Sequence, residues 1–263
     1  MKTKLYDFPV ESRALMTEGG IKLKGKRVIV RTDTKNPKPL AVVSDQYKIV
    51  PHKEVIRVFE NIKGIKQNRI NVCRDGAIMF GEYDIIGQKK LSNVDVKVGD
   101  TVNFKVRVFN SYDTSTGVGF EIMAVRLVCT NGLLVPSKMA RFAFKHFGNA
   151  DIGKIQEAIV GRLRSASQVA ETWKEWLKVK PSDNRVKKFF EANKKIGGEK
   201  TRKELMERAL GLKERNVWQI YNVVTEHFSH NMKFRSPDNQ AQRIRRKEYR
   251  ALPLFHTYKW NER

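Results

Sequence analysis

Basic residues occur at a spacing that would let them bind phosphate groups together. In the segment DTVNFKVRVFN, residues 100–110, apolar and polar residues alternate as in a half-buried β-strand, so Lys105 and Arg107 share the polar face. A helix is expected in the segment LLVPSKMARFAFKHF, with three cations along one side: Lys138, Arg141 and Lys145. If this helix folds back over the sheet, both sets of cations line one groove.

A second basic cluster lies near the C-terminus, beside aromatic residues. The segment RSPDNQAQRIRRKEYRALPLFHTYKW, residues 235–260, is expected to be an arm or docking strand. Aromatic rings next to cations can stack on unpaired bases of any sequence. The rings considered for this role are Phe109, Tyr112, Tyr249, Tyr258 and Trp260. The predicted nucleic-acid-binding residues are Lys105, Arg107, Arg126, Lys138, Arg141, Lys145, Arg243, Arg245, Arg246 and Tyr249.

Groups that could catalyse a reaction or hold a metal are present but do not converge in the sequence. Asp75, Glu82 and Asp84 lie near one expected hairpin and could form a two-metal nuclease site, although acids on an exposed hairpin are more often solvated. His227 and His230 have a spacing that could chelate zinc, but no second ligand pair accompanies them. No phosphate-binding loop of the GxxxxGK[ST] type is present. We therefore expect no catalytic residue, metal or cofactor, and keep a nuclease as an alternative.

The composition indicates a folded protein with a polyanionic partner. The 263 residues include 52 Lys and Arg against 28 Asp and Glu, a formal net charge of +24, and 40% of the residues are hydrophobic. So large an imbalance opposes folding through self-repulsion, and nucleic acid is the usual compensating partner. The chain has two cysteines and no recognisable signal peptide or membrane span, so we expect a protein of the reducing cytoplasm with no membrane contact.

The first half of the chain is expected to form a sheet with one or two helices. β-branched or alternating runs predict strands at residues 27–31, 40–44, 47–50, 69–74, 77–86, 100–110 and 117–130. The segment SYDTSTG, residues 111–117, is rich in turn-forming residues and connects the last two strands. A helix is predicted over residues 51–64, where Pro51 suits the first turn and Gly64 the end.

The second half is expected to be helical. Apolar residues recur at steps of three and four in four segments, residues 149–180, 182–198, 201–211 and 216–232. Thr201 and Glu204 have the spacing of a capping box at the start of the third. The predicted fold class is α+β, an antiparallel sheet with packed helices followed by a helical C-terminal domain. The expected boundaries are 1–148 for the nucleic-acid-binding core, 149–235 for the helical domain and 236–263 for the basic and aromatic arm.

The segments NSYDTSTG and VRLVCTNGL, with a histidine some 13 residues later, carry a resemblance to a known family. The pattern resembles a family of phage- and plasmid-encoded proteins classed as a domain of unknown function, with an NS-x-DGS turn followed by RVVCxNTL. The matching residues are Asn110, Ser111, Asp113, Arg126, Val128, Cys129, Asn131, Leu133 and His146. The upstream segment PLAVVSDQYKIVPHKEV is also similar, and the resemblance covers roughly residues 37–165. Thr114 stands where the family has glycine, and Gly132 where it has threonine.

The resemblance implies a companion of phage replication and recombination genes, without an established activity. The outline of the core is also similar to single-strand annealing proteins of the eukaryotic recombinase type. Within this resemblance Asp113 and Asn131 are turn and cap residues and Cys129 is a buried thiol. Arg126 either donates a buried hydrogen bond to the turn or contacts phosphate.

These observations together predict a sequence-tolerant, ATP-independent single-stranded DNA-binding protein of phage or mobile-element recombination. We expect it to anneal complementary strands, as a homo-oligomer, with phosphates held in a cationic groove and base edges left free. An RNA-binding host-takeover factor, a metal-dependent nuclease and a basic virion protein remain as alternatives, because nothing in the sequence separates DNA from RNA.

Overall fold

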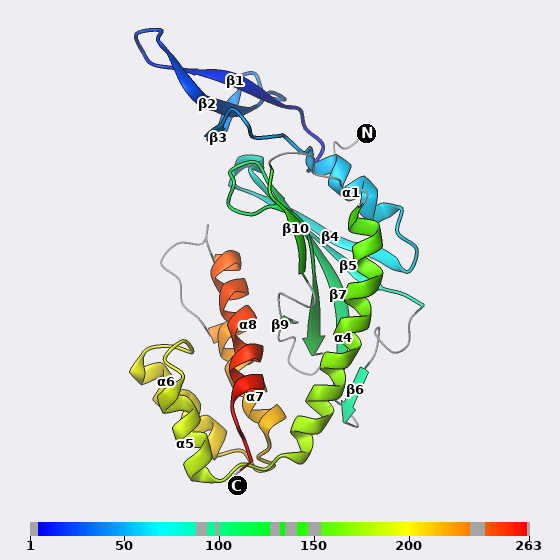
Figure 1. Ribbon diagram of the computed structural model, residues 1–263, viewed down its shortest axis with the longest axis vertical. Coiled ribbons are helices and arrows are strands. Elements are labelled where there is room, and N and C mark those ends of the chain that lie inside the picture. The colour runs from blue at the N-terminus through cyan, green and yellow to red at the C-terminus, as the bar shows by residue number, and fades with distance from the viewer. Residues whose placement is uncertain are drawn as a thin grey trace. The chain divides into compact units, whose positions relative to one another are not determined.

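The computed structural model describes residues 5–87, 94–97, 100–126, 132–134, 141–146, 154–231 and 240–261. Within these residues the chain is an α+β protein, as the sequence predicts, with antiparallel sheets and with helices in the C-terminal part (Figure 1). Its contacts divide it into two compact units that take alternating segments of the chain. Unit 1 is Met1–Gln88, Lys105–Glu121 and Arg141–Arg162, and unit 2 is Lys89–Phe104, Ile122–Ala140 and Leu163–Arg263. The domain boundaries expected at residues 148 and 235 remain predictions.

A three-stranded antiparallel sheet in unit 1 has the order β1-β2-β3. Its strands are β1 (Val10–Met16), β2 (Lys22–Arg31) and β3 (Lys38–Ser44). The strands pack on a small apolar cluster of Phe8, Ile29, Val43, Tyr47 and Tyr112. The β-branched runs in β2 and β3 predict these two strands, whereas the segment VESRALM of β1 has little of that pattern and was not expected to be a strand.

The larger sheet has seven strands in the order β10-β8-β7-β5-β4, with β6 paired to β7 and β9 paired to β8. The strands are β4 (Ile65–Cys73), β5 (Ile78–Ile85), β6 (Val94–Lys97), β7 (Asp100–Ser111), β8 (Val118–Arg126), β9 (Gly132–Leu134) and β10 (Arg141–Phe144). In β7 the side chains of Val102, Phe104, Val106 and Val108 are buried, and the residues between them are half-buried. The alternation in the sequence therefore predicts both this strand and its two faces correctly.

Helix α1 (His52–Glu60) packs on the larger sheet within unit 1. The helix begins directly after Pro51, as the sequence predicts. Proline is favoured at the start of a helix because the amide hydrogen that it lacks would have no partner in the first turn. The ring of Phe59 lies 5.6 Å from that of Tyr83 in β5 and 6.0 Å from that of Phe120 in β8. The apolar side of α1 is therefore set on the middle strands of the sheet.

Unit 2 contains helices around an aromatic core. The helices are α4 (Lys154–Lys178), of which the part from Leu163 belongs to this unit, α5 (Asp183–Ala192), α6 (Glu199–Leu210), α7 (Val217–Glu226), the π-helical turn η2 (His227–Asn231) and α8 (Gln240–Thr257). The side chains of Ser182 and Asn216 cap α5 and α7 at their N-termini. Trp173 packs on Trp218, with ring centroids 5.3 Å apart. In the described ranges, no helix combines the length and the apolar character needed to cross a membrane.

Four sequence predictions about the elements are wrong. Residues 47–50 are not a strand, and α6 begins at Glu199 after Gly198 rather than at the predicted Thr201 cap. The C-terminal segment predicted as an arm contains helix α8, with Ala251, Leu252 and Phe255 buried. The many charged residues and the internal Pro253 made the helical spacing of these apolar residues hard to recognise in the sequence.

The fourth wrong prediction is the helix over residues 133–147, because Arg141–Phe144 form strand β10 beside β8. Gly117 and Gly119 of the TGVGF segment explain the pairing. A Cβ atom at either glycine would collide with the backbone of Phe144 or Phe142. The absent side chains therefore let β10 approach β8 closely.

Candidate functional site

The residues of the N-S-x-D pattern build the turn between β7 and β8. Ser111 Oγ donates a hydrogen bond to the carbonyl oxygen of Thr116 (2.6 Å) and accepts one from the Thr116 amide (3.1 Å). The Asp113 carboxylate accepts a hydrogen bond from the Ser115 amide (2.9 Å). Thr114 has a φ of 60°, in the left-handed region that glycine adopts most readily, which accounts for the glycine of the pattern at this position. These polar residues therefore fix the shape of the turn.

His52, the first residue of α1, is tied to this turn. Its side chain is fully buried, with Nε2 2.9 Å from the carbonyl oxygen of Gly76 and Nδ1 2.9 Å from Asn110 Nδ2. Asn110 Nδ2 also donates to the carbonyl oxygen of Val50 (2.8 Å). Because an amide nitrogen can only donate, Nδ1 of His52 accepts, and Nε2 carries the proton that is donated to Gly76. His52 is therefore a neutral imidazole with both nitrogens hydrogen-bonded.

His146, the downstream histidine of the pattern, belongs to the same buried network. Its ring stacks on Tyr47 with 4.8 Å between centroids, and its Nδ1 lies 3.2 Å from the carbonyl oxygen of Lys48. The Tyr47 hydroxyl in turn donates to the carbonyl oxygen of Ser111 (2.8 Å). His146 Nε2 has no hydrogen-bond partner among the described residues. The network thus joins three segments that are far apart in sequence.

Burial controls the protonation of these side chains. Burial lowers the pKa of His52 to about 4, although its hydrogen bond to Gly76 acts in the opposite direction. The pKa of His146 is also lowered, chiefly by burial, and burial raises the pKa of the Tyr47 and Tyr112 hydroxyls. All four groups are therefore neutral near pH 7. The network is suited to holding the turn in place, since it offers neither a charge nor an accessible base.

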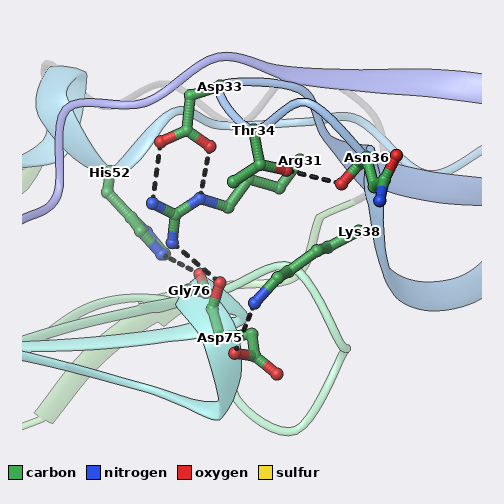
Figure 2. A network of polar contacts seen from close by, with 8 residues as sticks. All are labelled: Arg31, Asp33, Thr34, Asn36, Lys38, His52, Asp75 and Gly76. Atoms are coloured by element: carbon green, nitrogen blue, oxygen red, sulfur yellow. Dashed lines mark hydrogen bonds and ion pairs between the residues drawn. The ribbon is translucent and has the colours of Figure 1, made fainter.

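A second polar network holds the base of the three-stranded sheet on the neighbouring turn η1 (Arg74–Gly76), as Figure 2 shows. The Arg31 guanidinium donates two hydrogen bonds to the Asp33 carboxylate (2.6 and 2.8 Å) and one to the carbonyl oxygen of Asp75 (2.9 Å). It also lies 4.0 Å above the ring of Phe8. Lys38 Nζ lies 3.3 Å from the Asp75 carboxylate. Arg31 and Lys38 are therefore already paired with carboxylates.

The two turns are joined by an ion pair. Arg74 Nη1 donates to Asp113 Oδ2 over 2.8 Å, so the turn after β4 and the turn after β7 are held together. Arg74, Asp75 and Gly76 all have a positive φ, which is unusual for the first two residues. The pattern residue Asp113 therefore orders its own turn and also stabilises a strained neighbour.

The strand face predicted to be a cationic groove is a ladder of alternating charges. Lys105 Nζ lies 2.8 Å from Asp84, and Arg107 lies 3.4 Å from Glu82 and 3.7 Å from Glu121. The two cations are only 20% and 18% exposed. Their charges are compensated by carboxylates on neighbouring strands, so this face is less available to phosphate than its sequence suggests.

The carboxylates of the ladder are held in their charged form. Burial raises the pKa of Glu82, but its hydrogen bonds to Arg69 (2.9 and 3.0 Å) and the charge of Arg107 outweigh this effect, so the pKa lies below the ordinary value. The pKa of Asp84 is lowered in the same way, against the effect of burial, by Lys105 and Asn68. The ladder is therefore a set of ion pairs near pH 7.

Of the other predicted binding residues, the structure describes the side chains of two, Arg141 and Lys145. Arg141 lies in β10 opposite Glu121, with its guanidinium carbon 4.7 Å from the centre of the Phe109 ring. Lys145 is exposed just after β10, so these two residues do not line a helix. For Arg126 in β8, and for Arg243, Arg245, Arg246 and Tyr249 in α8, the structure describes the backbone but not the side chains, and Lys138, Cys129 and Asn131 lie outside the described residues. Their binding roles stay predictions.

Most of the aromatic rings considered for base stacking fill cores instead. Phe109, Tyr112 and Trp260 are buried, with 0%, 1% and 6% of their surface exposed. Tyr258 is half-buried and donates a hydrogen bond to the carbonyl oxygen of Arg185 (3.1 Å). The prediction that these rings stack on bases is therefore wrong for the buried three, because their surface is covered by the protein.

The acids considered for a metal site are each paired with cations. Asp75, Glu82 and Asp84 pair with different cations, Lys38, Arg69 and Lys105 respectively, among others. Within the described ranges, no group of three or more His, Cys, Asp and Glu side chains could hold a metal ion. The described residues therefore give the nuclease alternative no support.

Sequence reasoning missed His52, Arg31 and Gly76. His52 could have been noticed, because a histidine at the start of an amphipathic helix and next to the buried side is a candidate for a hydrogen-bonded core position. Arg31 and Gly76 gave no signal, since Arg31 bonds Asp75 and Gly76 bonds His52, both far away in the sequence.

The comparisons with known proteins agree with the pattern at the turn. The sequence model of the family described as a domain of unknown function (DUF932) matches residues 39–249, which include the turn, His52 and His146. No match was found among curated proteins or among solved structures. Since the match extends over most of the chain, the protein belongs to the DUF932 family of domains of unknown function.

Proposed function

We propose that the protein binds single-stranded DNA without sequence preference and without ATP. The observation that carries the proposal is the charge, 52 Lys and Arg against 28 Asp and Glu in 263 residues. Phosphate contacts made by such a surplus release counter-ions, which supplies most of the affinity of sequence-tolerant binding. A strand held only through its phosphates keeps its base edges free for pairing, so the same binding supports annealing.

The ion pairs of the larger sheet refine this proposal. Lys105 and Arg107 are compensated by acids, so the phosphate contacts must come mainly from cations elsewhere. A double reversal of these two residues to glutamate would also place new acids beside Glu82, Asp84 and Glu121, and the fold itself would suffer. A loss of binding in that variant could not be separated from unfolding.

The wider role that we propose is strand annealing in phage or mobile-element recombination or replication. It rests on the resemblance of the turn pattern and on the charge. Several protomers acting side by side in the host cytoplasm would suit a long flexible polyanion, and this assembly is part of the proposal.

The test measures binding of the full chain to a labelled single strand, to the duplex and to RNA of the same sequence, over a series of salt concentrations. We expect the single strand to bind best, with a log-log salt slope of about −0.7 per phosphate neutralised. Complementary strands should anneal faster with protein and without ATP. An affinity that does not depend on salt would refute the proposal.

The same assay separates the alternatives. Preference for RNA over DNA of equal sequence would show recognition of the 2′-hydroxyl and replace the proposal by the RNA-binding alternative. Shortening of the labelled strand after addition of magnesium or manganese would reveal a nuclease.

A further inference from the structure

Strands β1 and β2 extend into an arm, which we define as residues 13–27 and which at its base, at Lys26 and Arg27, also pairs with β3 (Figure 1, blue). All residues of the arm are exposed except Leu15, which is half-buried, so neither face of the ribbon is covered by the described residues. The backbone is nevertheless ordered by pairing of Ala14 with Arg27 and of Met16 with Lys22. At the tip the Thr17 amide donates to the carbonyl oxygen of Ile21 (2.9 Å). The arm is therefore a defined surface that is open to a partner.

The arm carries lysines that no acid of the described residues neutralises. It contains Arg13, Lys22, Lys24, Lys26 and Arg27, against the single acid Glu18. Arg13 pairs with Glu11, at the base of β1, but no described carboxylate lies within ion-pairing distance of the three lysines. They differ in this respect from the paired Lys105 and Arg107 of the larger sheet.

The arm also exposes large apolar side chains, which are uncommon on a ribbon that only faces solvent. Six large apolar side chains of the described residues are exposed, and three of them lie in the arm: Met16 (50%), Ile21 (69%) and Leu23 (43%). Exposed apolar groups gathered in one place commonly mark a contact surface. Along an extended strand Ile21 and Leu23 point to one face and Lys22 and Lys24 to the other. Near its tip the ribbon therefore carries lysines and apolar side chains close together, and Met16 lies opposite Lys22 in the register of the two strands.

We propose that this arm holds the bound nucleic-acid strand, a proposal that rests on the function proposed above. Lysines of the arm would contact phosphates, and the apolar side chains near the tip would pack against base faces, as apolar residues of other proteins do between base steps. The charge of the arm is complementary to a polyanion and unsuited to docking on a second, equally cationic copy of the chain. The arm precedes residue 39, so it lies outside the part of the chain that the family matches.

The first test compares two variants of the full chain with the same change in charge. The arm variant carries Lys22→Glu, Lys24→Glu and Lys26→Glu, and the control carries Lys187→Glu, Lys188→Glu and Lys203→Glu on exposed positions of α5 and α6. If the arm lysines hold three phosphates, the salt slope of single-strand binding should fall by about 2 and the affinity near 0.15 M salt by roughly 50-fold. The control should keep the slope of the wild type.

The second test separates the apolar contact from the charges. Ile21→Ser with Leu23→Ser should weaken binding about tenfold without changing the salt slope, because apolar contacts release no counter-ions. A photo-crosslinker placed at position 23 should capture the labelled strand, and one at position 187 should not. Circular dichroism and urea unfolding show for each variant whether the fold is intact. If the Lys→Glu arm variant is unfolded, a version with Lys→Gln at the same three positions takes its place.

The outcomes distinguish this inference from the proposed function. If the wild type binds no nucleic acid, the proposed function fails and the arm assignment fails with it. If the wild type binds, and the arm variant binds as well as the control, only the arm assignment is overturned. It is also overturned if the serine variant turns an oligomer into monomers while the arm variant behaves as the control, since the arm would then join copies of the chain. Binding of anionic vesicles that needs the arm, with strand binding that does not, would assign it to a membrane surface instead.

Discussion

His52 takes up a proton far less readily in the folded chain than in the unfolded chain. Its pKa falls from 6.5 to about 4 because the ring is buried, and burial disfavours the charged imidazolium. As the pH falls from 6.5 toward 4, the unfolded chain binds this proton first. The free energy of unfolding should therefore decrease over this window by about 3 kcal/mol on account of His52 alone. Above pH 6.5 this contribution is fully present.

Urea unfolding at pH 7 and at pH 4.5 tests this expectation. The variant His52→Asn should lose less stability between the two values than the wild type does, whatever its stability at pH 7. His230→Asn is the matched control, because His230 is exposed, and it should follow the wild type. Equal pH dependence in the wild type and the His52 variant would contradict the assignment, and the buried His146 would then carry the effect.

The ion pairs show which properties of single residues can be predicted from the sequence. Alternation correctly places Lys105 and Arg107 on the polar face of β7. Their partners, however, lie on neighbouring strands, opposite them in register: Asp84 faces Lys105 and Glu82 faces Arg107. Register depends on how the strands pair in three dimensions, so a charged face read from one strand gives its cations but not the acids that neutralise them.

The turn η1 between β4 and β5 depends on the absence of a side chain at Gly76. This residue has a φ of 109°, and a Cβ atom would lie 2.6 Å from Cζ of Phe8 and 3.1 Å from Nη1 of Arg31. Gly87 is a matched control, because its φ is 74° and no atom of the described residues lies within 4 Å of its Cβ position. Both glycines suffer backbone strain on substitution by alanine, but only Gly76 also meets a collision.

We therefore expect Gly76→Ala to lower the free energy of unfolding by at least about 2 kcal/mol more than Gly87→Ala does. Combining Gly76→Ala with Phe8→Leu should recover part of the loss, since the smaller side chain makes room. Equal losses for the two glycines in urea unfolding would show that Phe8 does not pack on the turn.

Elements with a strong pattern were predicted, and elements that depend on distant contacts were not. Helix α1, helix α4 and the hairpin of β4 and β5 follow from their spacing and turn residues. β10 is a strand because Gly117 and Gly119 leave room beside β8, which no property of the segment itself reveals. The turn residues Asn110, Ser111 and Asp113 were recognised as a pattern, whereas the network that unites them with His52 needed the fold.

At the scale of the whole molecule, an unbalanced charge of +24 works against the folded state. Salt screens this repulsion, and it also weakens surface ion pairs, which contribute little each. Because the repulsion among the surplus cations outweighs the stabilisation by the ion pairs, the stability of the folded state should rise with salt.

We expect the Tm to increase by roughly 5 °C between about 20 and 300 mM NaCl, the shift that about 2 kcal/mol produces in a chain of this size. The control variant with three Lys→Glu changes on α5 and α6 has a formal charge lower by 6, from +24 to +18, and should show a smaller increase by calorimetry. A Tm that falls with salt would mean that pairs such as Lys105 with Asp84 outweigh the repulsion, and the surplus would then be no argument for a polyanionic partner.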